Sequence, residues 1–240
     1  MNTEDVRSAY NKEDRTHYEE QRWTSSPVAK SGYILTKEAI EKRVLPHLSE
    51  IKEYLEIGPG PGTWTRILLP ALSDARIHLV DISRTMLDSA KKNLPPDSRY
   101  EFTESDFLAF TPERKYDILF SSRALEYFPD KDPVVATISQ SLRRGGRAYL
   151  ITKMPHYTRM KMLGKDPSPF HSQQISPRAL SEIFQRNEMI VLSVYPVYVV
   201  FPALHLSWLN LLLTRFLRIF PWNFLTASLA ESYLITAEKS

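Results

Sequence analysis

Residues 51–62 read IKEYLEIGPGPG, and the architecture of the whole chain follows from them. Residues 51–57 predict a short strand that runs directly into a glycine-proline turn. Three of the seven glycines of the chain then follow at alternate positions, Gly58, Gly60 and Gly62. Residues 65–72 return to a helical spacing of apolar side chains. A strand that enters a helix through a glycine-rich turn indicates a site for an anion or a nucleotide, because glycine permits close backbone approach and the helix start offers free N–H groups.

Segments with strand-like and helix-like patterns alternate along the rest of the chain. The expected strands cover residues 51–57, 76–81, 100–103, 116–121, 147–152, 189–195 and 232–238. Helical segments of about 10–15 residues between strands are the pattern of βαβ units. The sequence therefore predicts one doubly wound α/β domain with a parallel sheet.

Cap residues and prolines mark the ends of the expected helices. Ser83 and Ser176 are expected N-caps, and Asp132-Pro133 is expected to open a helix with a cap and a first-turn proline. Gly145-Gly146 is expected to end that helix before the next strand. A helix capped by Thr36 is expected ahead of the first strand.

The chain divides into an N-terminal extension, residues 1–50, and a main domain, residues 51–240. The extension is expected to be helical and to act as a lid, with a disordered tail over residues 1–14. Within the main domain, residues 154–175 are expected to form a long loop on the substrate side. Residues 200–231 are expected to form an apolar helical insertion before the last strand.

Composition excludes several kinds of site. The 240 residues carry a formal net charge of +3 with no basic tract, so nucleic acid is not an expected partner. The chain has no cysteine, which excludes disulfides, thiolate metal sites and a cysteine nucleophile. Its six histidines are scattered, and no metal site is expected. The first 20 residues are highly charged and unlike a secretory signal, so a cytoplasmic location is expected.

The spacing of the glycines separates two classes of cofactor. A dinucleotide fingerprint, G-x-G-x-x-G, would require glycine at the position of Thr63, and a count from Gly60 fails at Thr65. An NAD-dependent oxidoreductase is therefore disfavoured. The observed pattern is instead acid-x-G-x-G-x-G, beginning at Glu56. It resembles motif I of the class I S-adenosylmethionine-dependent methyltransferases.

Further segments resemble that family in the same order along the chain. Asp81 ends the second strand where the family places an acid on the ribose hydroxyls, and a carboxylate can accept two hydrogen bonds from a vicinal diol. Ile82 and Met86 would cover one face of the adenine, and Asp106 would accept from its exocyclic amine. The cofactor residues that the resemblance implies are Glu56, Gly58, Pro59, Gly60, Gly62, Thr63, Trp64, Asp81, Ile82, Met86, Ser105, Asp106, Phe107 and Ser122.

The resemblance covers residues 54–154 and implies S-adenosylmethionine as cofactor, with S-adenosylhomocysteine as product. It also implies a seven-stranded, mostly parallel sheet with an antiparallel last strand, the Rossmann-like methyltransferase fold. The last strand would pair antiparallel with the sixth. Such a fold does not determine the acceptor.

Catalysis by this family requires alignment of a nucleophile with the activated methyl group, and a general base only where the nucleophile keeps its proton. Relatives often carry a histidine after the fourth strand, whereas this chain has Arg123 and Glu126. This pair indicates either an anionic substrate or a salt-bridged loop. His156 and His171, in the loop after the fifth strand, are the other candidate bases. Tyr10, Tyr18, Arg22, Trp23 and Tyr127 are the candidate lid and substrate residues.

The segment 203–220 is strongly apolar and is expected to be a helix. Ser207, Asn210, Thr214 and Arg218 fall along one narrow face of it. The segment could pack on the core, cover a hydrophobic substrate, form a homodimer interface or lie at a membrane surface. A small-molecule or lipid-like acceptor is therefore the expected substrate. A non-catalytic cofactor-binding, membrane-peripheral or partner-binding module on the same fold is the alternative.

Overall fold

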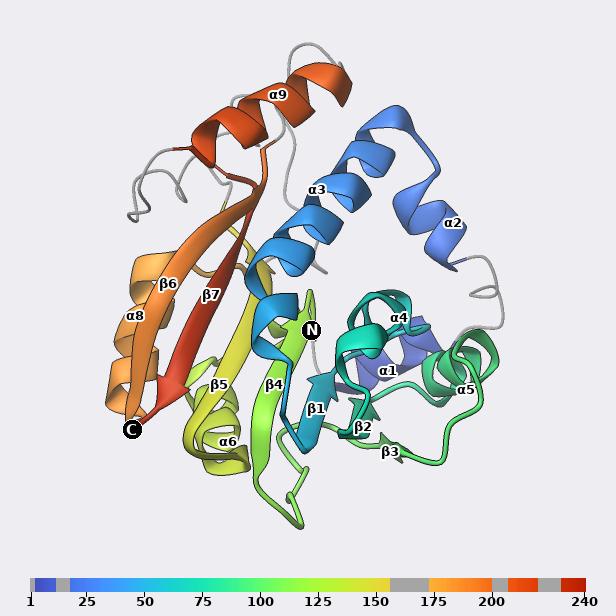
Figure 1. Ribbon diagram of the computed structural model, residues 1–240, viewed down its shortest axis with the longest axis vertical. Helices are drawn as coiled ribbons and strands as arrows, with labels where there is room; N and C mark the ends of the chain where they lie inside the picture. The colour runs from blue at the N-terminus through green and yellow to red at the C-terminus, as the bar shows by residue number, and fades with distance from the viewer. Residues whose placement is uncertain (1–2, 12–17, 156–172, 200–206, 220–229) are drawn as a thin grey trace.

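The structure, a computed structural model, describes residues 3–11, 18–155, 173–199, 207–219 and 230–240. Seven strands form one sheet in the described chain: β1 (Glu53–Ile57), β2 (Arg76–Asp81), β3 (Tyr100–Glu104), β4 (Tyr116–Ser122), β5 (Leu142–Lys153), β6 (Met189–Tyr198) and β7 (Ser232–Lys239). Their order in the sheet is β3-β2-β1-β4-β5-β7-β6 (Figure 1).

The direction of the strands confirms the predicted topology. β7 is antiparallel to both of its neighbours, β5 and β6, and the other pairs are parallel. The strand order reverses between β1 and β4. Open α/β sheets bind ligands at the carboxyl ends of the strands beside such a switch point.

Helices cover both faces of the sheet. The described α-helices are α1 (Thr3–Tyr10), α2 (Tyr18–Trp23), α3 (Pro27–Arg43), α4 (Thr63–Leu68), α5 (Arg84–Asn93), α6 (Asp132–Ser141), α8 (Pro177–Arg186) and α9 (Ser207–Leu217), with 3-10 turns at Leu45–His47, Leu69–Ala71 and Leu125–Tyr127. Figure 1 shows α3 and α4 on the opposite side of the sheet from α6 and α8.

Strand β1 shows why helices cover both faces of the sheet. Successive residues of a strand point to opposite faces, and here both faces are apolar. Tyr54 packs in one core with residues of α3 and α4, whereas Leu55 packs in the other with residues of α6 and α8. Both side chains are fully buried. The central strand is therefore fixed from both sides, and its carboxyl end is held rigidly.

Two predicted helix caps are confirmed, two are wrong, and one predicted helix end lies in a strand. Ser83 and Ser176 cap α5 and α8 with their side chains. Thr36 lies inside α3, where it bonds to the carbonyl of Gly32, and the cap of α3 is Ser26. Pro133 lies in the first turn of α6 as predicted, but Asp132 is itself helical and accepts hydrogen bonds from Arg186 of α8 and from Asn187 just after it. Gly145-Gly146 lies within β5, because α6 ends at Ser141.

The N-terminal tail also differs from the prediction. Residues 3–10 form helix α1, and its Val6 and Ala9 are buried. Ser83 at the start of α5 donates to the side chain of Asn11 at 2.7 Å. This contact between segments 72 residues apart fixes the end of α1 against the main sheet.

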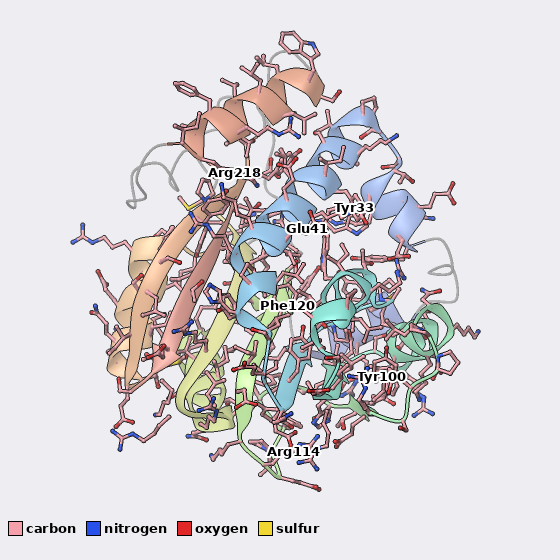
Figure 2. All side chains as sticks on the ribbon, in the orientation of Figure 1. Tyr33, Glu41, Tyr100, Arg114, Phe120 and Arg218 are labelled. Carbon is pink, nitrogen blue, oxygen red and sulfur yellow. The ribbon has the colours of Figure 1, made fainter. Side chains whose placement is uncertain are left out.

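Helix α9 packs against α3 and β6 with its polar face, the reverse of the usual arrangement. Asn210 and Thr214 are buried, and Thr214 accepts a hydrogen bond from the backbone of Val199 at 3.1 Å. Figure 2 shows Arg218 pointing from the end of α9 toward α3 and β6. The large apolar residues of the helix, Trp208, Leu212 and Phe216, are exposed together with Ile219. No helix in the described part of the chain is long and apolar enough to cross a membrane.

Candidate active site

A cavity of about 370 Å³ opens at the carboxyl ends of the central strands. Its walls come from the glycine loop, the ends of β2 and β4, the segment after β3, and helices α1 and α2. The predicted site residues that line it are Gly58, Gly60, Asp81, Ile82, Met86, Ser105, Asp106, Phe107, Ser122, Arg123, Glu126, Tyr127, Tyr10, Tyr18 and Arg22. Residues from six separate stretches of sequence therefore meet in one place.

The glycine loop turns sharply between β1 and α4. Gly58 has a φ of 66° and Gly60 a φ of 56°, a region that side-chain-bearing residues rarely adopt. A Cβ atom on Gly58 would lie 2.8 Å from the Cβ of Ala124. Gly58 also donates to the carbonyl of Val80 at 2.8 Å. The loop backbone therefore forms one wall of the cavity without a side chain in the way.

Asp81 holds the loop and faces the cavity. One carboxylate oxygen accepts from the backbone N–H of Gly60 at 3.1 Å and the other from that of Ser83 at 2.9 Å. Burial raises the pKa of Asp81 to about 6. Each oxygen has a second lone pair, so the carboxylate can accept further hydrogen bonds from a ligand.

Glu56 lies under the loop and does not line the cavity. Its side chain is 1% exposed and accepts from the hydroxyls of Tyr54 at 3.0 Å and Thr65 at 2.9 Å. Burial raises the pKa of Glu56 to about 7. Because Thr65 belongs to α4, this acid connects β1 to the helix that follows the glycine loop. Glu56 therefore shapes the loop through its neighbours.

The segment after β3 supplies an apolar and acidic wall. Phe107 is buried and stacks on Phe110 with ring centroids 5.9 Å apart. Asp106 accepts from the backbone N–H of Leu108 at 3.0 Å. Ser122, at the end of β4, has a buried hydroxyl with no hydrogen-bond partner among the described residues. A buried polar atom of this kind in a cavity wall fits a ligand that supplies the partner.

Other residues of the predicted cofactor set lie outside the cavity lining. Pro59, Gly62, Thr63 and Trp64 are not part of it. Thr63 donates to Glu19 of α2, and Trp64 packs on Trp23 and Tyr33 with ring centroids 5.1 and 5.4 Å away. Trp23, a predicted lid residue, therefore anchors α2 on α3 and α4 and does not face the cavity.

The N-terminal helices form one side of the cavity. Tyr10, Tyr18 and Arg22 line it, and the hydroxyls of Tyr10 and Tyr127 form a hydrogen bond. Glu19 accepts from Arg66 of α4 at 2.7 Å, which fixes α2 over the glycine loop. Burial raises the pKa of Tyr127 to about 12, so that its hydroxyl stays neutral.

The segment after β4 brings two charged side chains to the cavity. Arg123 has a φ of 68° and donates through its backbone N–H to the carbonyl of Ile151 at 2.8 Å. Its guanidinium lies 3.4 Å from a carboxylate oxygen of Glu126, which is itself 1% exposed. The salt-bridged loop anticipated from the sequence is therefore present. His156 and His171 lie outside the described residues.

Eight lining residues were not among the predicted site residues: Val6, Ala9, Ile57, Val80, Leu108, Ala124, Phe128 and Pro129. Ile57 and Val80 directly precede residues that were identified, so strand alternation offered a signal for them. Val6 and Ala9 lie four and one positions before Tyr10, and a helical interpretation of residues 3–10 would have placed them together. Within the described residues, no group of three or more histidines and acids could hold a metal ion.

The known proteins that are similar to this chain are methyltransferases. Residues 55–148 match the family described as "Methyltransferase domain". The chain is 28% identical over 146 residues to a malonyl-acyl-carrier-protein O-methyltransferase of Ilyobacter polytropus, covering 58% of this chain and 54% of that protein. It is 30% identical over 133 residues to a trans-aconitate 2-methyltransferase of a strain of Enterobacter, covering 55% and 51%. The chain thus spans about half the length of these curated relatives.

Solved structures show the same fold over the full length. Magnesium protoporphyrin IX methyltransferase from Synechocystis PCC 6803, with bound S-adenosylhomocysteine, aligns with a TM-score of 0.70 at 16% identity, over 100% of both chains. The N-methyltransferase NodS of Bradyrhizobium japonicum aligns with a TM-score of 0.64 at 13% identity, over 100% and 99%. With its glycine loop and strand order, the chain carries a methyltransferase domain over residues 55–148 and is similar to the class I S-adenosylmethionine-dependent methyltransferases.

Proposed function

We propose that this protein transfers a methyl group from S-adenosylmethionine to a small-molecule or lipid-like acceptor. The observation that carries the proposal is the cavity in which Gly58, Gly60, Asp81 and Asp106 meet. Its volume of about 370 Å³ lies in the range of small-molecule and cofactor sites. The unpartnered hydroxyl of Ser122 and the glycine backbone fit a polar ligand at this position.

Nine of the lining residues have a role in the proposed cofactor site. The backbone of Gly58 and Gly60 would approach the amino-acid part of the cofactor closely. Asp81 would accept from the ribose hydroxyls, and Asp106 from the adenine amine. Ile82, Met86 and Phe107 would cover the adenine ring. Ser105 and Ser122 would donate to the remaining polar atoms.

The protein's contribution to the chemistry is alignment and exclusion of water. When bound, the cofactor supplies a methyl group already activated by a positive sulfonium. The rigid carboxyl ends of β1, β2 and β4 fix one side of the cavity, and α1 and α2 form the other. This arrangement would hold an acceptor beside the methyl group and keep water out.

Two kinds of evidence support a small acceptor. The relatives cited above are named for malonyl-acyl-carrier protein and trans-aconitate, both of which present a small acid. The cavity, as the described residues line it, is enclosed by short segments around Tyr10, Tyr18 and Tyr127 and has no long groove of basic residues. The exposed apolar face of α9 does not line this cavity, so the lipid-like alternative depends on contact of that face with a membrane.

The apolar face of α9 supports association with a second surface, either a membrane or another copy of the chain. Trp208, Leu212, Phe216 and Ile219 are each more than half exposed. Flotation with anionic vesicles tests for membrane binding, and sedimentation of the free protein tests for self-association. Flotation lost in the variant Leu212→Glu would support a membrane surface, and a dimer lost in the same variant would support self-association.

A labelled-methyl assay tests the enzymatic proposal. The protein is incubated with methyl-tritiated S-adenosylmethionine and a low-molecular-weight cell extract, and labelled products are separated by chromatography. We expect label to enter small molecules, with a loss of about 10-fold or more in Asp81→Asn, since a hydrogen bond to a charged group is removed. A protein that binds S-adenosylhomocysteine and transfers no label would instead support a non-catalytic binding module.

A further inference from the structure

Three cationic side chains converge where α2 meets the segment after β4. Arg22 and Arg123 line the cavity directly. Lys153, at the end of β5, is 14% exposed, and burial, followed by the positive charge of Arg123, lowers its pKa. Arg22 also acts electrostatically on Lys153 and on Tyr127. These charges therefore belong to one cluster, which lies beside the segment after β4.

The acids of the chain neutralise only part of this cluster. Glu126 lies 3.4 Å from Arg123, and Glu231 lies 3.8 Å from Lys153. Arg22 has no ion-pair partner among the described residues, and its guanidinium lies over the ring of Trp23 at 5.1 Å. The buried Nε of Arg123 also has no hydrogen-bond partner in the described chain. Within the described residues, the charge of Arg22 at the cavity wall is therefore left without an acid partner.

We propose that the methyl acceptor is a carboxylate, bound through its negative charge by Arg22 and Arg123. This inference rests on the proposed function and names its substrate class. A guanidinium presents a planar pair of donors that matches the two oxygens of a carboxylate. The single uncompensated charge matches a carboxylate better than a dianionic phosphate. The hydroxyls of Tyr10, Tyr18 and Tyr127, at the same wall, offer further neutral hydrogen-bonding groups.

A carboxylate acceptor also agrees with the residues that the cavity contains. An ordinary carboxyl has a pKa of about 4 and is already deprotonated at neutral pH. One of its oxygens forms the bond to the methyl carbon while the carbon–sulfur bond breaks and its electron pair remains on sulfur. The products are a methyl ester and S-adenosylhomocysteine, and no proton is transferred. No general base is then needed, and the described lining of the cavity contains no histidine.

Binding measurements on the protein loaded with S-adenosylhomocysteine test this substrate class. The probes are benzoate, octanoate, malonate and citrate, each compared with its amide by saturation-transfer NMR. We expect at least one acid to bind and its amide not to bind. Arg22→Gln should weaken binding of that acid by about 10- to 100-fold, because a charged hydrogen bond is lost. Arg123→Gln should have a similar effect.

Arg178→Gln provides the matched control, because Arg178 is 85% exposed on α8 and is not part of the cavity. It should leave both acid binding and affinity for S-adenosylhomocysteine unchanged. Equal binding of acids and amides, no binding of any acid, or full acid binding by Arg22→Gln would overturn the inference while the proposed function stands. Failure of S-adenosylhomocysteine to bind would remove the proposed function itself.

In the labelled-methyl assay, products should release labelled methanol on treatment with alkali, as methyl esters do.

Discussion

Gly58 combines a positive φ with a close neighbour across the cavity wall. Replacement by alanine would force a left-handed backbone on a residue with a Cβ and would bring that atom to 2.8 Å from Ala124. Gly145 provides a matched control, since it has a φ of 71° and nothing within 4 Å of its added Cβ. We expect Gly145→Ala to reduce the free energy of unfolding by about 1–2 kcal/mol.

Gly58→Ala should cost about 1–3 kcal/mol more than this control, because the clash adds to the same backbone strain. It should also weaken binding of S-adenosylhomocysteine, whereas Gly145→Ala should not. Urea unfolding and calorimetry measure the two effects. Equal stability of the two variants would mean that the contact with Ala124 relaxes freely and that Gly58 is needed for its conformation alone.

Glu56 makes stability depend on pH. Its pKa is raised by burial to about 7 in the folded protein, against 4.5 as the ordinary value. Between these pH values the folded state binds more protons than the unfolded state, so this group's contribution to stability decreases as pH rises. The difference corresponds to a cost on the order of 3 kcal/mol for the ionised form.

The variant Glu56→Gln should remove that contribution. Between pH 4.5 and 7, the free energy of unfolding of the variant should increase relative to that of the wild type as pH rises. Asp117, whose pKa is lowered by its hydrogen bonds and by Arg143, acts in the opposite direction in both proteins and cancels in the comparison. A difference that does not change with pH would contradict a raised pKa at Glu56.

At the scale of elements, Arg218 holds helix α9 in place. Its guanidinium donates to the carbonyls of Leu35 at 2.7 Å and Val197 at 2.8 Å and to the carboxylate of Glu38 at 2.9 Å. The side chain is 7% exposed. Replacement by methionine would keep much of the volume and leave the carbonyls of Leu35 and Val197 without this donor.

We expect Arg218→Met to reduce the free energy of unfolding by about 3–5 kcal/mol, the usual effect of breaking a buried charged contact. Arg215→Met is the control, because Arg215 pairs with the same Glu38 but is 57% exposed. An exposed pair contributes about 0–1 kcal/mol. Urea denaturation of both variants measures the difference, and similar losses would show that Arg218 does not anchor the helix.

Strands were predicted more accurately than helix ends, and particular residues show why. The segment 76–81 was identified to the residue because apolar character stops sharply at both ends. The start of α3 was missed although Ser26-Pro27 repeats the cap-and-proline signature of Ser176-Pro177, which was recognised. The local signal was present at both places.

The orientation of α9 could not be predicted from its pattern. A helix normally buries its apolar face, whereas here Thr214 and Arg218 face inward. Their partners are backbone groups of Leu35, Val197 and Val199, which carry no sequence signal. Only the tertiary structure brings those groups beneath the helix.

At the scale of the whole molecule, the cofactor side of the cavity could be anticipated because its residues follow consecutive strands. Gly58, Asp81, Asp106 and Ser122 each come at or just after a strand end, and parallel strands bring these ends together. The side formed by α1 could not be anticipated in the same way. Its position depends on long-range contacts such as that of Asn11 with Ser83.

Calorimetric titration with S-adenosylhomocysteine tests the central claim, that this cavity is the cofactor site. We predict micromolar binding by the wild type and a loss of about 10-fold or more in Asp81→Ala. Asp74→Ala, at a carboxylate that is 71% exposed, should bind as the wild type does. Absence of binding by the folded wild type, or unchanged binding by Asp81→Ala, would contradict the account.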